Sequence, residues 1–283
     1  MNIGYLGPPG TFTQQAAERI GANFPAGCLT DYQAIEDALQ AVSEHKIDLA
    51  AVPLENTTEG VVNATIDALI FEYDLYIQCE LSLPIEQCLM LKNPRAAGSH
   101  IGTIYSHRQS LAQCRKYIRA NYPSVNLIEM TSNAEAARYV SEHKENCAAI
   151  GPRAAAQLYQ LTIAAENIQD QKNNATTFIA LSDTPGEILP DVKTTIAFST
   201  ENKPGALYKV LDIFSLWDIN MTKILSRPMK NRPGEYVFYV DLEDYYVKDL
   251  DDALTMVKRK TDFYKFLGSY CNIAVPILTL GLS

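Results

Sequence analysis

The feature that most constrains the fold is a continuous apolar run, Ile47–Leu54, which ends abruptly in polar residues. A strand that is apolar on both faces is typical of a parallel sheet that helices cover on both sides. The neighbouring patterns agree, because Tyr32–His45 before the run and Val61–Phe71 after it have apolar residues at helical spacing. The N-terminal part is therefore predicted to be an α/β unit.

The alternation of strand and helix patterns continues to about residue 182. Strands are predicted at Ile3–Leu6, Leu75–Leu83, Ile85–Leu91, Ile101–Tyr105, Asn126–Met130, Cys147–Ile150 and Thr176–Leu181, and helices at Thr13–Ile20, Gln109–Asn121, Asn133–His143 and Arg153–Tyr159. This order predicts two parallel-sheet lobes that bind ligands beyond the carboxyl ends of their strands. We assign residues 1–75 with 165–182 to one lobe and residues 76–164 to the other.

The pattern changes after residues 183–192, whose Pro, Gly and Asp content predicts a linker. Strand and helix patterns then follow in the order Thr194–Phe198, Pro204–Leu216, Ile219–Leu225, Tyr236–Leu242, Leu250–Lys260 and Phe263–Cys271. A βαββαβ order within about 80 residues is the ferredoxin-like arrangement. The sequence thus predicts a second domain over residues 193–272 and an apolar tail over residues 273–283.

Composition excludes several classes of function. The chain has a net charge of −9 and no run rich in Lys or Arg, which argues against nucleic-acid binding. The longest apolar stretch, Ile273–Leu282, is shorter than the roughly 20 residues that a membrane helix needs, and the N-terminus does not resemble a signal peptide. The six cysteines and four histidines lack metal-ligand spacing. We expect a cytoplasmic protein that needs no metal and no cofactor.

Four polar or Gly-rich segments lie at the ends of predicted strands: Gly7–Thr11, Glu55–Gly60, Ser106–Gln109 and Asn173–Phe178. The first could present backbone N–H groups to an anion at the start of a helix. Each segment alone is equally consistent with a capped helix or an ordinary turn. Four of them in one chain predict a ligand site.

These segments belong to a longer series of motifs that resembles a known family. In order, Gly7–Phe12, Pro53–Gly60, Ser106–Cys114, Thr131–Ala137 and Asn173–Phe178 resemble the motifs of prephenate dehydratases, and Pro204–Leu207 and Ser226–Pro228 resemble the phenylalanine-binding motifs of their ACT domain. The resemblance implies two lobes like those of type II periplasmic-binding proteins, with the substrate in the cleft between them. It also implies a homodimer or homotetramer.

The implied reaction converts prephenate to phenylpyruvate with loss of carbon dioxide and water, in the biosynthesis of L-phenylalanine. Aromatisation of the ring drives it, so no cofactor is implied. By resemblance, Thr176 assists departure of the ring hydroxyl, Glu55 supplies the proton or orders the site, and Asn56 orients the substrate.

The resemblance also implies two sets of binding residues. The substrate set is Gly10, Thr11, Thr57, Ser106, His107, Arg108, Gln109, Asn174, Thr177 and Phe178. The set for the effector L-phenylalanine is Gly205, Ala206, Leu207, Leu225, Ser226, Arg227 and Pro228. For His107, a helix-start cap is an equally good interpretation.

The chain departs from the family motifs at several positions. Thr177 stands where an arginine usually binds a substrate carboxylate, and Arg108 stands where a proline is usual. One hypothesis is that Arg108 supplies the charge that Thr177 lacks; the alternative is a solvent-exposed arginine without a catalytic role. Asn133 replaces a hydroxyl residue, and Leu225 replaces a glutamate, which could alter effector coupling.

Two other functions stay open at this stage. One is a prephenate decarboxylase that does not aromatise the ring, and the other is a catalytically weak regulatory protein that binds amino acids. The product formed from prephenate separates the three: phenylpyruvate, a non-aromatic acid, or none. A fused chorismate mutase activity is not expected, because no such segment precedes Met1.

Overall fold

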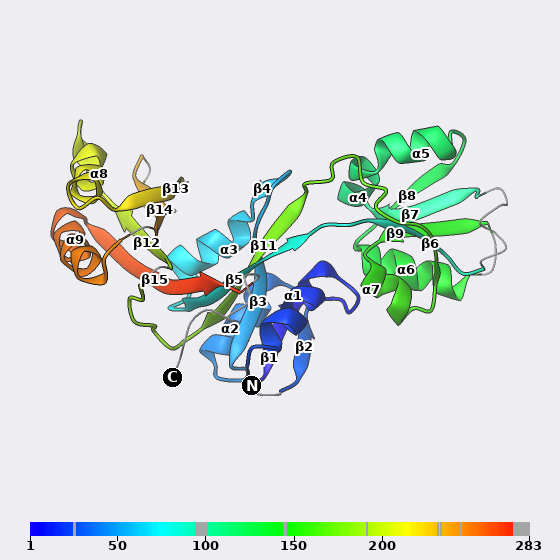
Figure 1. The fold of residues 1–283 in the computed structure, drawn as a ribbon, viewed down its shortest axis with the longest axis horizontal. Helices are drawn as coiled ribbons and strands as arrows, with labels where there is room; N and C mark the ends of the chain where they lie inside the picture. The colour runs from blue at the N-terminus through cyan, green and yellow to red at the C-terminus, as the bar shows by residue number, and fades with distance from the viewer. Residues whose placement is uncertain are drawn as a thin grey trace. The chain divides into compact units, whose positions relative to one another are not determined.

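The computed structural model describes residues 1–24, 27–93, 101–143, 146–190, 192–230, 232, 234–243 and 245–273 (Figure 1). The chain forms two compact units. The first unit comprises Met1–Ala38, Ala51–Val62 and Ser82–Phe178, and the second comprises Leu39–Ala50, Asn63–Leu81 and Ile179–Ser283. The second unit therefore includes residues 63–81 besides the C-terminal segment. Apart from Ile273, the predicted apolar tail lies outside the described residues.

One sheet of the first unit has the strand order β10-β6-β9-β7-β8. Its strands are β6 (Cys88–Leu91), β7 (Thr103–His107), β8 (Asn126–Met130), β9 (Cys147–Gly151) and β10 (Thr162–Ala165). Strand β7 runs parallel to β8 and β9, whereas β6 runs antiparallel to β9 and β10. The sheet is thus mixed rather than fully parallel.

Helices cover both faces of this sheet (Figure 1). Helices α4 (Arg108–Gln113) and α5 (Arg115–Asn121) share a buried cluster with Leu89 and Leu91. Helices α6 (Asn133–Glu142) and α7 (Arg153–Leu158) share another with Cys88 and Met90. Successive side chains of β6 alternate between the two clusters, which is why its sequence is apolar throughout.

The other strands of the first unit follow the order β11-β3-β1-β2, with β4 paired to β3. These strands are β1 (Ile3–Leu6), β2 (Leu29–Tyr32), β3 (Leu49–Asn56), β4 (Gly60–Val61) and β11 (Ala175–Ser182). The helices are α1 (Phe12–Gly21) and the first turn of α2 (Ile35–Ser43), whose remainder belongs to the second unit. Strand β3 coincides with the predicted apolar run, and its Ala50, Ala51 and Val52 are fully buried. The prediction of an α/β fold with two sheets is confirmed.

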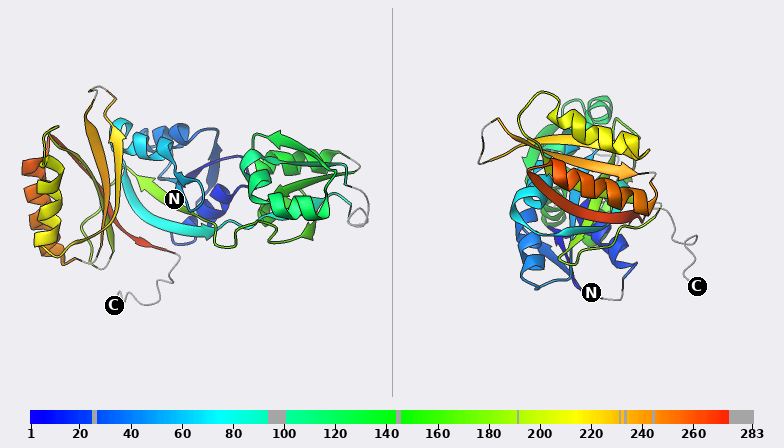
Figure 2. Two further views of the ribbon diagram at one scale, coloured as in Figure 1. Left: turned by 90° about the horizontal axis from the view of Figure 1, so that it is seen from above. Right: turned by 90° about the vertical axis from the view of Figure 1, so that its left-hand side faces the viewer.

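The second unit has the strand order β13-β14-β12-β15-β5. Its strands are β12 (Lys193–Ser199), β13 (Asn220–Pro228), β14 (Tyr236–Glu243), β15 (Phe263–Asn272) and β5 (Tyr76–Pro84). Helices α8 (Ala206–Leu216) and α9 (Val247–Lys260) lie side by side on one face of the sheet (Figure 2). The predicted βαββαβ order is therefore present.

The second unit also contains α3 (Asn63–Asp67), followed directly by η1 (Ala68–Glu72). Strand β13 contacts α3 through Arg227. The guanidinium of Arg227 on β13 donates from Nε to Asp67 Oδ1 and from Nη2 to Asp67 Oδ2, both at 2.7 Å, and from Nη1 to Asn63 Oδ1 at 2.8 Å. All three nitrogens of this side chain are thus engaged. A two-pronged pair of this kind fixes geometry as well as charge.

The sheet also carries a buried polar network. The hydroxyl of Thr195 donates to Asp241 Oδ1 at 2.7 Å and lies 2.6 Å from the Tyr270 hydroxyl. Asp241 is 2% exposed, and its burial raises the pKa of its carboxyl group, although the hydrogen bond from Thr195 and attraction by Lys193 offset part of the rise. Keeping this carboxylate ionised in the folded protein costs free energy.

We predict that Asp241→Asn stabilises the protein near neutral pH. Because the folded pKa of Asp241 lies above its ordinary value of 3.8, the stability that this group contributes is complete below that value and is lost as the pH rises through the folded pKa. Asparagine keeps the acceptor oxygen for Thr195 and does not ionise. The thermal midpoint of the variant should exceed that of the parent at about pH 7 and approach it as the pH falls. Asp252→Asn, at an exposed position of α9, is the control, and an equal gain there would contradict the explanation.

Candidate active site

A pocket of about 320 Å³ lies in the first unit. It is lined by residues from the start of α1, the β3–β4 turn, the segment before β6, the β7–α4 junction, the start of α6 and strand β11. These residues are Phe12, Thr13, Pro53, Asn56, Glu59, Gly60, Val61, Val62, Ile85, Gln87, His107, Gln109, Ser110, Gln113, Asn133, Thr176 and Phe178. Three of the four segments that the sequence singled out therefore contribute to one cavity.

The best-defined pair in the pocket is Asn56 and Thr176, which are both 8% exposed. Asn56 Oδ1 accepts the backbone N–H groups of Thr58 at 2.9 Å and Glu59 at 3.0 Å, so its amide can face only one way. Its Nδ2 consequently donates to Thr176 Oγ1 at 2.8 Å. Because a lone pair of Thr176 is used in this contact, its hydroxyl hydrogen remains available to donate to a ligand.

Thr177 lies on the other side of β11. Thr176 and Phe178 line the pocket, whereas the hydroxyl of Thr177 lies 3.0 Å from Ser82 Oγ. Neighbouring residues of a strand point to opposite faces, so a side chain at position 177 leaves the strand away from Thr176. The prediction that Thr177 lines the substrate site is not supported, and its replacement of arginine removes no charge from this lining.

Arg108 is also outside the lining. It is exposed, whereas its neighbours His107 and Gln109 both line the pocket. His107 caps α4, since its Nδ1 accepts the backbone N–H of Gln109 at 3.4 Å, and its Nε2 is then the protonated nitrogen. Arg108 is the first residue of α4, a position that suits proline because the N–H there has no helical partner. This geometry gives no support to the hypothesis that Arg108 replaces a missing cleft charge, which stays a prediction.

Gly10 and Thr11 form the start of α1 without lining the pocket. The N–H of Gly10 donates to Gln14 Oε1 at 2.5 Å, and Thr11 Oγ1 accepts the N–H of Gln14 at 3.3 Å. The predicted anion-binding turn is therefore a helix cap whose donors are engaged within the chain. Phe12 and Thr13, the next two residues, reach the pocket instead.

Three other predicted site residues do not line the pocket but are next to lining residues in the sequence. Ser106 is fully buried and donates to Ile150 O at 2.7 Å and Asn133 Oδ1 at 2.9 Å. Thr57 accepts the N–H of Ala175 at 3.0 Å, which ties the β3–β4 turn to β11. Glu55 is half-buried on β3 opposite Val61, outside the lining.

Sequence reasoning missed several lining residues, notably Glu59, Gln87, Ser110 and Gln113. Glu59 occupies the same motif as Glu55, so the motif was found, but the sequence analysis assigned a role to Glu55 alone, and that assignment stays a prediction. Gln113 lies four residues after Gln109 on α4, and residues at this spacing share a helix face. That spacing was the signal available for Gln113.

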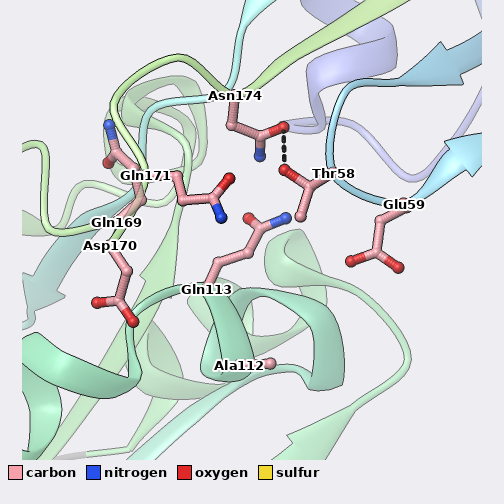
Figure 3. Close-up of a pocket in the computed structure, with 8 residues that line it drawn as sticks. All are labelled: Thr58, Glu59, Ala112, Gln113, Gln169, Asp170, Gln171 and Asn174. Atoms are coloured by element: carbon pink, nitrogen blue, oxygen red, sulfur yellow. Dashed lines mark hydrogen bonds between the residues drawn. The ribbon is translucent and has the colours of Figure 1, made fainter.

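A smaller pocket of about 190 Å³ adjoins the first (Figure 3). Glu59 and Gln113 line both pockets, and Asn174 lines the smaller one. Among the lining residues that the structure describes, neither pocket contains Lys or Arg. The polar groups that line the two pockets are hydroxyls, amides, the imidazole of His107 and the carboxylates of Glu59 and Asp170.

The described parts of the chain offer neither a metal cluster nor a membrane-spanning helix. Those residues contain no group of three or more His, Cys, Asp or Glu that could hold a metal ion. They also include no helix that is both long enough and apolar enough to cross a bilayer.

The fold and the pocket define an α/β enzyme with a ferredoxin-like C-terminal module. A sequence model of the family described as prephenate dehydratase matches residues 3–185. The chain therefore belongs to the prephenate dehydratase family, and the predicted identity of the enzyme is confirmed.

Individual relatives agree with this assignment. A bifunctional chorismate mutase/prephenate dehydratase of Aquifex aeolicus is 41% identical over 272 residues, which are 95% of this chain and 73% of the relative. A prephenate dehydratase of Bacillus subtilis is 38% identical over 268 residues, 90% of this chain and 91% of the relative. The solved prephenate dehydratase of Arthrobacter aurescens, in complex with L-Phe, has a TM-score of 0.86 at 31% identity and covers 97% of this chain and 91% of its own.

We predict that Thr176→Ala lowers kcat at least about a hundredfold, the usual effect of losing a proton-transfer group. Thr177→Ala is the matched control, because it removes the same hydroxyl from the adjacent residue on the opposite face of β11. Steady-state kinetics with prephenate should show less than about a threefold change for the control. Near-normal turnover by Thr176→Ala would remove Thr176 from the mechanism.

We further predict that Arg108→Pro changes kcat/KM less than about threefold, because proline fits the first position of α4. The changes in activation free energy, derived from kcat/KM, for Arg108→Pro and Thr177→Arg should add within about 0.5 kcal/mol, as expected for positions that share no partner. A double-mutant cycle measured on kcat/KM tests this. Recovery of a lost activity by Thr177→Arg would restore the hypothesis of an exchanged charge.

Proposed function

We propose that this chain converts prephenate to phenylpyruvate in the 320 Å³ pocket, with Thr176 as the hydrogen-bond donor to the departing ring hydroxyl. The supporting observation is the chain of contacts from the N–H groups of Thr58 and Glu59, through Asn56, to Thr176 Oγ1. Each contact orients the next, and linked hydrogen bonds polarise one another.

The reaction requires two bond cleavages. The bond from the ring to its carboxylate breaks and its electron pair enters the ring, which releases carbon dioxide. The ring C–O bond then breaks, and one proton converts the leaving hydroxide to water. Thr176 is a weak acid, so we propose that it passes on a proton rather than consuming its own. We assign Glu59, the acidic residue among the described lining residues, to donate a proton to Thr176 from its carboxylic acid form as Thr176 gives its own to the leaving hydroxide.

The apolar part of the lining has a complementary role. Phe12, Val62, Ile85 and Phe178 line the pocket together with Pro53. Decarboxylation removes the negative charge of the carboxylate. The reaction is therefore faster in surroundings that do not stabilise this charge in the bound substrate. We therefore place the ring and its carboxylate against these side chains.

The product formed from prephenate tests this function directly. We expect phenylpyruvate, detected by its ultraviolet absorbance and by mass spectrometry, together with one equivalent of carbon dioxide. A non-aromatic keto acid would instead identify a decarboxylase, and the absence of any turnover would favour a regulatory binding protein.

We also propose that residues 193–272 form an ACT domain that binds L-phenylalanine, in a cytoplasmic homodimer or homotetramer. Gly205 has a φ of 77° and open space where a Cβ would lie, so a ligand could approach the main chain of Gly205–Leu207 closely. Ile224 on β13 is 43% exposed, and Tyr208 and Leu216 on α8 are 67% and 73% exposed. Exposed apolar residues beside an edge strand suit contact with a second copy.

Within this proposal, Arg227 has a different role from the one implied by its motif. Its guanidinium is engaged by Asp67 and Asn63 rather than available to an effector. Asn63 directly follows Val62, which lines the pocket immediately after β4. We propose that this contact transmits effector binding on the ACT domain to the turn that holds Asn56.

We predict that Asp67→Asn weakens inhibition by L-phenylalanine at least about fivefold, the lower end of typical coupling between sites. Calorimetry on the intact protein should show that L-phenylalanine still binds. Lys230→Ala is the control, because it removes a 2.7 Å ion pair to Glu72 that is exposed to solvent and should matter little. Unchanged inhibition in Asp67→Asn would contradict the coupling role, and absence of binding in the parent would contradict the effector site.

A further inference from the structure

Two cysteines are direct neighbours on adjacent strands of the second unit. Strand β15 runs parallel to β5 (Figure 1), and Cys271 on β15 is the partner of Cys79 on β5 in this ladder. Both residues are free thiols. Because side chains alternate along each strand, partners in a ladder extend to the same face of the sheet. The two thiols therefore lie on one face, side by side.

The next pair of the ladder shows that side chains at these positions meet. Asn272 is the partner of Glu80, and its Nδ2 donates to Glu80 Oε1 at 3.4 Å. This contact lies on the opposite face of the sheet from the cysteines, because it is one residue further along each strand. Burial raises the pKa of the Cys79 thiol to about 12, and the thiol of Cys271 adds to the rise. The electrostatic effect agrees with the ladder that the two sulfur atoms are close together.

The spacing of the two strands suits a disulfide bond. Neighbouring strands are about 4.8 Å apart, and the Cα atoms of a disulfide are usually about 4.4–6.8 Å apart. The backbones of β5 and β15 also approach closely just before the cysteine pair, since a Cβ at Gly268 would lie 2.4 Å from Ile77 O. A bond between Cys79 and Cys271 therefore needs only a small approach of the two side chains.

The two cysteines differ in their access to solvent. Cys79 is 3% exposed, whereas Cys271 is half-buried. A cysteine reacts with an oxidant as its thiolate, and only where the oxidant reaches it. Burial and a raised pKa both disfavour Cys79 as the first residue to react. Cys271 is therefore the position at which an oxidant from solvent attacks, and Cys79 is the thiol that lies ready to react with the product.

We infer that Cys79 and Cys271 form a redox-sensitive site, at which a peroxide converts two thiols to a reversible disulfide. The thiolate of Cys271 attacks one oxygen of hydrogen peroxide, the O–O bond breaks, and the hydroxide that leaves takes a proton to become water. The thiolate of Cys79 then attacks the sulfur of the sulfenic acid, and a second hydroxide leaves and becomes water. The two protons are those of the original thiols, so the two sulfurs are oxidised and the peroxide is reduced to two waters.

The bond would reinforce a short connection. The described ladder between β15 and β5 has two residue pairs, whereas the ladder between β15 and β12 has seven. Strand β5 continues at Ser82 into the first unit. The disulfide would thus tie the βαββαβ module covalently to the strand that connects it with the rest of the chain. This inference does not depend on the proposed function, because it concerns the chemistry of the two thiols alone.

The test oxidises the intact protein in dilute solution. Reduced protein is treated with hydrogen peroxide, the remaining thiols are alkylated, and a proteolytic digest is analysed by mass spectrometry. We expect peptides linked through Cys79 and Cys271, with a loss of two hydrogens that dithiothreitol reverses. The thermal midpoint of the oxidised protein should exceed that of the reduced protein by at least about 4 °C, because a cross-link over a long loop restricts the unfolded chain.

Variants assign both effects to this pair. Cys271→Ser should abolish the link and the rise in thermal midpoint, and Cys79→Ala provides an independent variant if circular dichroism shows that the first is not folded. Cys28→Ser, at an exposed cysteine, is the matched control and should keep both effects. Oxidation of Cys271 to a sulfinic acid with Cys79 still a thiol would overturn the inference. A link to any other cysteine, or a rise in thermal midpoint that persists in Cys271→Ser, would also overturn it.

Discussion

The arrangement of the active site depends on one hydrogen bond, from Asn56 to Thr176. The two residues are 120 positions apart in sequence and meet because β3 and β11 are neighbouring strands. The bond has a single direction, because backbone N–H groups hold the amide oxygen of Asn56. The fold therefore determines which atom of Thr176 faces the ligand as a donor, without a charged group to enforce it.

The sequence predicted the structure best where the pattern of apolar residues matches the burial of the side chains. The apolar run of β3 predicted a strand covered on both faces, and its central residues are fully buried. The same reasoning, applied to Thr176, Thr177 and Phe178, would have separated the middle residue from its neighbours, because strand residues alternate. The interpretation of Thr177 as a cleft residue followed the family motif instead. Gln14 stands three residues after the N-cap Thr11, the spacing of a capping box, so the contact of its side chain with the N–H of Gly10 had a sequence signal that went unused.

The departures at Thr177 and Arg108 have a simpler physical explanation than an exchanged charge. Position 177 faces Ser82, and position 108 is the solvent-exposed first residue of a helix. Neither position controls the charge of the pocket. The described lining instead consists of hydroxyls and amides, mainly on α4 and β11, together with His107 and the carboxylate of Glu59.

The lack of a cation among the described lining residues has a consequence for a reaction that releases carbon dioxide from a carboxylate. A cation placed near both carboxylates of the substrate would stabilise the one that must leave, and so would raise the barrier to decarboxylation. Short-range amide donors discriminate better, because a hydrogen bond weakens steeply with distance and angle, whereas a charge acts over several ångströms. Apolar side chains of the lining, such as Phe178, can surround the carboxylate that leaves. On this argument, the lack of a cation among the described lining residues suits the chemistry.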